Sequence, residues 1–137
     1  MLNENSIIKL TTEVKSPRRF VFVLIENFTL LSFSSALDAL RIANRMSGKD
    51  LYEWIFIGEN EEVVSCSAGT QFKLDNSLIE LHRDDTLLLC GGTQIQESTT
   101  KKLIGWLRRE ARRGLVIGGL CTAAYPMAKA GLLDGKK

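Results

Sequence analysis

Residues 115–124 read LVIGGLCTAA, an apolar run that passes through two glycines into a cysteine followed by small residues. This pattern predicts a strand, a tight turn and a helix, with the cysteine at the apex of the turn. The backbone at such an apex is strained, so the neighbouring side chains must be small. Gly119 lies two residues before Cys121, and Ala123 lies two residues after it. We therefore expect an elbow that presents Cys121 in an exposed position.

Outward from this elbow, apolar runs alternate along the chain with amphipathic segments. The runs are rich in Val, Ile, Leu and Phe, which predicts buried strands over residues 20–25, 54–57, 86–90 and 115–117. Between them, apolar residues recur at spacings of three and four, which predicts helices. The alternation predicts an α/β fold, a three-layer sandwich with a mostly parallel sheet and helices on both faces.

Capping residues and turn residues predict where these elements begin. The three helices are expected to start at Ser34 or Ser35, at Ser98 or Thr99, and at Tyr125. Two short β-rich segments, over residues 63–66 and 71–74, predict a hairpin at the edge of the sheet.

The composition limits the function classes. The 137 residues suffice for one folded domain, and 18 Lys and Arg against 16 Asp and Glu give a net charge of +2. With this small net charge, the segment lacks the excess of basic residues that is typical of a nucleic-acid-binding domain. No apolar run reaches the roughly 18 residues of a membrane helix, and the polar N-terminus does not look like a signal peptide. We expect a cytoplasmic protein with a mobile lead-in over residues 1–18, in which residues 7–10 are a candidate strand.

Three cysteines without paired spacing argue against a disulfide framework and favour reduced thiols. Cys66 and Cys90 lack the glycine-rich context of Cys121, so we assign them to packing. With no CxxC motif and a single histidine, His82, the sequence predicts no metal site, and it indicates no cofactor.

A candidate ligand site follows from the expected topology. In open α/β sheets, ligands bind at the carboxyl ends of the strands. Gly91 and Gly92 follow the strand before the elbow, so they are expected to face Cys121. The backbone N–H of Thr122 is a candidate for half of an oxyanion hole, with the glycine pair supplying the other half.

Several stretches resemble the ThiJ/PfpI superfamily, which has the class I glutamine-amidotransferase-like, flavodoxin-like fold. The similarity is greatest to the sensing domain of GlxA-type AraC-family transcriptional regulators. It rests on residues 28–31, 37–44, 89–92, 119–123 and 130–135, and spans about residues 19–137. The resemblance implies an incomplete sensing domain, because its last strands and the C-terminal helix-turn-helix pair that binds DNA are expected to lie outside this chain.

The resemblance also implies a homodimer that responds to a small-molecule effector. Similar regulators control the use of choline, glycine betaine, carnitine or arginine, so the expected effector is a small amine or an amino-acid derivative. We expect its pocket to be marked by Cys121, Thr122, Ala123, Gly91, Gly92, Ser32 and Glu26.

Enzymes of this superfamily place a carboxylate beside the cysteine, just before the first helix. The corresponding residue here is Ser32, and Glu26 lies six residues earlier, at the end of a strand. Amidotransferases add a histidine, but His82 precedes a strand and is expected at the opposite side of the sheet from Cys121.

Three readings remain open at this point. The first is a regulator's sensing domain without catalytic activity. The second is a cysteine-dependent hydrolase or hydratase, which needs a group that moves protons. The third is a redox- or aldehyde-responsive domain in which Cys121 is oxidised.

Overall fold

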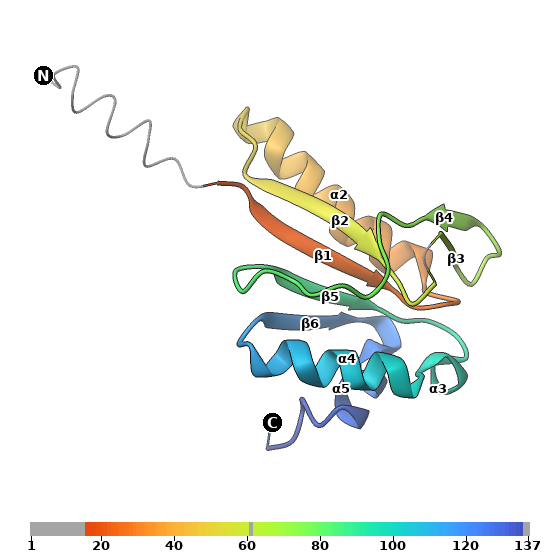
Figure 1. The fold of residues 1–137 in the computed structure, drawn as a ribbon. Coiled ribbons are helices and arrows are strands. Elements are labelled where there is room, and N and C mark those ends of the chain that lie inside the picture. The colour runs from red at the N-terminus through yellow and green to blue at the C-terminus, as the bar shows by residue number, and fades with distance from the viewer. Residues whose placement is uncertain (1–15, 61, 136–137) are drawn as a thin grey trace, which may run out of the picture.

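The computed structural model describes residues 16–60 and 62–135. The candidate strand near residues 7–10, and nearly all of the expected lead-in, lie outside these residues. Strands and helices alternate through most of the chain (Figure 1). The elements are β1 (Arg18–Leu24), α2 (Leu30–Ser47), β2 (Tyr52–Ile57), β3 (Val63–Ser65), β4 (Gln71–Lys73), β5 (Thr86–Cys90), α3 (Ile95–Ser98), α4 (Lys101–Arg112), β6 (Val116–Leu120) and α5 (Ala124–Lys129).

Four strands form one parallel sheet in the order β2-β1-β5-β6. Because all four run in the same direction, their carboxyl ends meet at a single edge. The register pairs Leu24 with Cys90, and Cys90 with Leu120, so the loops after β1, β5 and β6 leave the sheet at the same level. This edge therefore brings together the segments that precede α2, α3 and α5.

Both faces of the sheet are covered, which confirms the predicted three-layer architecture. Phe22 and Leu24 pack into a core with α2, whereas Val21 and Val23 pack into a second core with α4 and α5. Side chains alternate across a strand, so one apolar run fills both cores. Figure 1 shows α2 on one side of the sheet and α4 on the other.

The hairpin forms a separate unit and is not an edge of the main sheet. Strands β3 and β4 pair with each other in an antiparallel two-stranded sheet. The backbone N–H of Asn27 donates to the Ser65 carbonyl at 2.8 Å, and the N–H of Ser67 donates to the Phe28 carbonyl at 2.9 Å. The hairpin is thus attached to the loop after β1, beyond the carboxyl ends of the parallel strands (Figure 1).

The predicted starts of two helices were wrong. Helix α2 begins at Leu30, with Thr29 as its N-cap, and the Ser34 hydroxyl donates to the Leu31 carbonyl. Serine side chains make such backward bonds inside helices, so Ser34 does not cap this one. Helix α4 is capped by Thr100, whose hydroxyl accepts from the Leu103 N–H at 3.1 Å.

The segment after Cys121 also differs from the prediction of one helix over residues 125–133. Residues 121–123 form a 3-10 turn, and α5 ends at Lys129. No helix in the described part of the chain is both long and apolar enough to cross a membrane.

Strand β5 places one thiol deep in the core, with a consequence for stability at high pH. Burial raises the pKa of Cys90 from 9.0 to about 12. The folded state therefore keeps a proton that the unfolded chain releases above about pH 9. Between about pH 9 and 12, Cys90 is expected to lower the free energy of unfolding by about 1.4 kcal/mol per pH unit.

Urea denaturation of the wild type and Cys90→Ala at several alkaline pH values measures this term. The variant is expected to be less stable overall, but its stability should fall less steeply with pH. If the free energy of unfolding falls equally steeply with pH in both proteins, the raised pKa of Cys90 is contradicted.

Candidate functional site

The elbow has the geometry that its sequence predicts. Cys121 follows β6 directly and has a φ of 57°, in the left-handed region that non-glycine residues rarely adopt. A Cβ on Gly119 would lie 2.8 Å from the Met127 Sδ and 3.2 Å from the Ala123 Cβ. Ala123 itself is completely buried. Small residues on both sides therefore allow the turn to close and leave Cys121 exposed.

The side chain that contacts the cysteine was missed by the sequence analysis. Thr29 places its Oγ1 3.2 Å from the Cys121 Sγ, and either atom is able to donate. Although Thr29 is the N-cap of α2, its hydroxyl makes no capping hydrogen bond. Its position just after Phe28 and before an amphipathic helix was the available signal, because threonine is a favoured N-cap.

Among the described residues, the hydrogen bond to the Cys121 thiol comes from Thr29 and not from Ser32. Ser32 lies in the first turn of α2, and its hydroxyl donates to the Thr29 carbonyl at 3.1 Å. The helix starts four or five residues earlier than predicted, and this start makes Thr29 its N-cap.

Gly91 and Gly92 are closely packed between the loop after β1 and the elbow. A Cβ on Gly92 would collide with the Asn27 carbonyl oxygen and lie 2.7 Å from the Thr29 nitrogen. A Cβ on Gly91 would lie 2.8 Å from the Ala123 nitrogen. Only glycine fits at either position without movement of the backbone.

Hydrogen bonds fix the position of this glycine pair. The Thr122 hydroxyl donates to the Gly92 carbonyl at 2.7 Å, and the Thr29 N–H donates to the Gly91 carbonyl at 3.0 Å. The Gly91 N–H donates to the Leu120 carbonyl at 3.3 Å, so it is already engaged. Of the two glycine N–H groups, that of Gly92 therefore remains the candidate donor to an oxyanion hole.

Backbone strain is concentrated at this edge of the sheet. The non-glycine residues with positive φ in the described chain are Asn27, Gln94 and Cys121, which follow β1, β5 and β6. The Asn27 side chain donates to the Gln94 side chain at 2.9 Å. Strained residues persist where the surrounding structure holds them, and they cluster at functional sites.

Glu26 belongs to a neighbouring cavity and not to the elbow. It is exposed, and its Oε2 accepts from the Ser65 N–H at 3.4 Å. His82 precedes β5, at the amino end of the strands, so it lies away from Cys121 as predicted.

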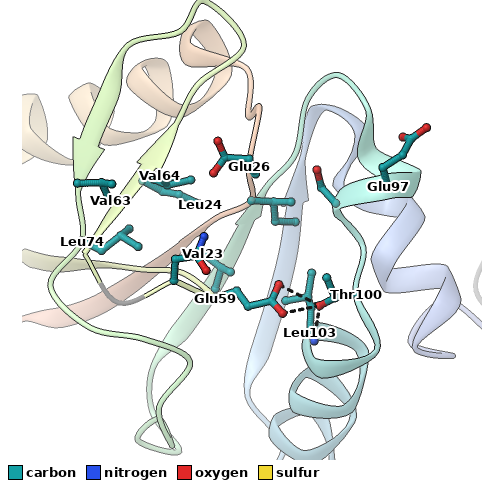
Figure 2. A pocket seen from close by; sticks show the side chains of 13 residues that line it. Val23, Leu24, Glu26, Glu59, Val63, Val64, Leu74, Glu97, Thr100 and Leu103 are labelled. Atoms are coloured by element: carbon teal, nitrogen blue, oxygen red, sulfur yellow. Dashed lines mark hydrogen bonds between the residues drawn. The ribbon is translucent and has the colours of Figure 1, made fainter.

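The cavity beside Glu26 has a volume of about 260 Å³. It lies between the end of β1, the hairpin and the start of α4 (Figure 2). Its lining residues are Val23, Leu24, Ile25, Glu26, Glu59, Asn60, Val63, Val64, Leu74, Glu97, Ser98, Thr100 and Leu103.

The elbow offers an exposed thiol next to a hydroxyl. A threonine hydroxyl does not ionise near neutral pH, so it is a poor general base. No carboxylate or imidazole is hydrogen-bonded to Cys121 among residues 16–60 and 62–135. The same residues hold no cluster of metal-binding side chains.

Exposure separates the three cysteines, and this gives a prediction for thiol labelling. Cys121 is exposed, whereas Cys66 and Cys90 are 1% and 0% exposed. An aromatic disulfide reagent is expected to modify one thiol rapidly in the native protein and the other two only at the rate of unfolding. Cys121→Ser should remove the rapid phase. A rapid phase that survives in that variant would contradict the placement of the cysteines.

Comparison with known proteins shows which family the chain resembles. The profile of the DJ-1/PfpI family matches residues 18–137. The HTH-type transcriptional regulator GbdR of Pseudomonas aeruginosa is 38% identical over 121 residues, which cover 88% of this chain and 33% of that protein. The HTH-type transcriptional regulator GlxA of Rhizobium meliloti is 32% identical over 127 residues, which cover 92% and 39%. The chain spans about a third of the length of these curated relatives.

Solved structures agree with the fold. An AraC family transcriptional regulator from Pseudomonas putida superimposes with a TM-score of 0.74 at 28% identity, over 86% of this chain and 63% of that one. A DJ-1 superfamily protein from Agrobacterium tumefaciens gives 0.68 at 22% identity, over 86% and 61%. At this lower identity the similarity shows the fold alone.

Proposed function

The chain belongs to the DJ-1/PfpI family, and we propose that it is the effector-sensing domain of an AraC-family transcriptional regulator. The similarity to GbdR and CdhR, at 38% and 36% identity over most of this chain, supports the proposal. The observation that carries it is the contact at the elbow. Cys121 faces the Thr29 hydroxyl, where a superfamily enzyme needs a group that moves protons.

The proposal includes partners beyond this domain. We infer that the full protein binds DNA through a C-terminal helix-turn-helix pair, acts as a homodimer and works in the cytoplasm. The effector that we propose is a small amine or amino-acid derivative of the choline, betaine, carnitine or arginine type. The pocket predicted from the sequence, marked by Cys121, Thr122, Ala123, Gly91 and Gly92, stays a prediction.

A thermal-shift screen of the full-length protein against quaternary amines and amino acids tests the proposal. A ligand that binds only the native state raises the midpoint of unfolding. At least one compound is expected to do so and to change transcription from the regulated promoter. Consumption of that compound by the protein would contradict the proposal.

One alternative has specific support. Cys121 is exposed and has the strained backbone of a nucleophile elbow, which favours a cysteine-dependent hydrolase or hydratase. That alternative requires turnover that disappears in Cys121→Ser.

A further inference from the structure

We propose that the cavity between the end of β1, the β3–β4 hairpin and the start of α4 binds a small organic cation with an apolar portion. This inference rests on the proposed sensing function, and it places the effector in this cavity instead of in the elbow pocket predicted from the sequence. Of the pocket residues expected from the sequence, only Glu26 lines this cavity.

The cavity has the size and the apolar walls of a small-ligand site. Its volume of about 260 Å³ is slightly below the ~300 Å³ at which pockets for drug-sized ligands begin. A ligand of few heavy atoms therefore fits. Val23, Leu24, Val64, Leu74 and Leu103 are buried and line it. Such walls favour an alkyl or methyl portion of a ligand, because its burial removes apolar surface from water.

Two carboxylates give the cavity a negative charge. Figure 2 shows Glu26 and Glu59 on different sides of the cavity, whereas the Glu97 carboxylate is directed away from it. None of the ion pairs between described residues involves Glu26 or Glu59. Their potential attracts a cation and disfavours an anion, which sets the charge of the ligand.

Glu59 is fixed in position before a ligand arrives. The Thr100 hydroxyl lies 2.9 Å from each Glu59 carboxylate oxygen and donates to that carboxylate. The same hydroxyl accepts from the Leu103 N–H at 3.1 Å and so caps α4. A carboxylate held in this way loses little conformational freedom when it binds a cation.

The walls come from parts of the chain that are far apart in sequence. Glu26 lies two residues after β1 and accepts from the Ser65 N–H of the hairpin, while Glu59 accepts from the Thr100 hydroxyl that caps α4. A cation between these carboxylates joins the hairpin to α4. Ligand occupancy is thereby linked to the relative placement of two surface elements, as a sensing domain requires.

The test is calorimetric titration of the 137-residue chain with choline and with its uncharged isostere 3,3-dimethylbutan-1-ol. These compounds differ in the charge of the central atom of a group of the same shape. Choline is expected to bind at millimolar concentrations or below, and about tenfold or more tightly than the isostere.

Glu59→Gln and Glu26→Gln are expected to weaken choline binding about tenfold. Glutamine keeps an acceptor for Thr100, so the α4 cap is preserved, and the unfolding midpoint of each free variant checks this. Glu53→Gln is the matched control, since it removes the same charge from an exposed site on β2 outside the cavity. It should bind choline within about twofold of the wild type.

Absence of choline binding, equal affinity for choline and its isostere, or unchanged affinity in both cavity variants overturns this inference. If choline binding instead depends on Thr122 and not on Glu59, the sensing function stands and only its place moves to the elbow. Turnover of a substrate that is lost in Cys121→Ser refutes the sensing function whatever the cavity binds.

Discussion

Gly92→Ala is expected to lower the free energy of unfolding by about 3 kcal/mol or more. The added methyl group would meet the Asn27 carbonyl oxygen, and it would lie 2.7 Å from the Thr29 nitrogen and 2.8 Å from the Phe28 carbonyl carbon. All three are backbone atoms, which cannot rotate away as a flexible side chain does. The loop after β1 must therefore move, and Thr29 loses its contact with Cys121.

Urea denaturation followed by circular dichroism measures this effect. Gly105→Ala is the matched control, because its Cβ in the middle of α4 would lie 3.7 Å or more from neighbouring atoms. In a helix interior, alanine is favoured over glycine by roughly 0.5–1 kcal/mol, so this variant should be slightly more stable. A Gly92→Ala protein as stable as the wild type would contradict the close packing of the loop against the glycine pair.

Asp85→Ala is expected to lower the free energy of unfolding by about 3 kcal/mol. The Asp85 carboxylate is 4% exposed and accepts from Arg19 Nε at 3.0 Å and Nη2 at 2.7 Å. It also accepts from the His82 N–H at 2.8 Å. Removal leaves a partly buried guanidinium and a backbone donor without their acceptor, and this costs more than the loss of a surface ion pair.

The paired carboxylate also raises the pKa of Arg19, chiefly through their hydrogen bond. Arg19 therefore stays charged at any pH used in an unfolding experiment, and the loss in Asp85→Ala should persist from neutral to alkaline pH. The neighbouring Asp84 is exposed, so Asp84→Ala should change stability by less than about 0.5 kcal/mol. Equal effects of the two substitutions would contradict the buried pair.

The strands and layers were predictable because buried parallel strands are continuous apolar runs. The run over residues 20–25 indicated a strand covered on both faces, and its alternate side chains do fill two cores. The elbow was also predictable, because a tight turn requires small residues around Cys121 and the sequence has them at these positions.

The contacts of the site were less accessible from sequence. The hydrogen bond between Thr29 and Cys121 depends on where α2 starts, and a helix start shifts with caps that depend on tertiary contacts. The cavity at Glu59 depends on where the hairpin lies, and hydrogen bonds between distant backbone groups determine this position. Neither Glu59 nor Thr100 belongs to a local motif, so no spacing in the sequence pairs them.

The central claim is that this domain binds a small molecule without chemistry at Cys121. The most direct test measures ligand affinity and ligand consumption side by side in the wild type and in Cys121→Ser, with a compound identified by thermal shift. We predict that the dissociation constants of the two proteins agree within about twofold and that neither protein consumes the compound. Consumption by the wild type that disappears in Cys121→Ser would contradict the account.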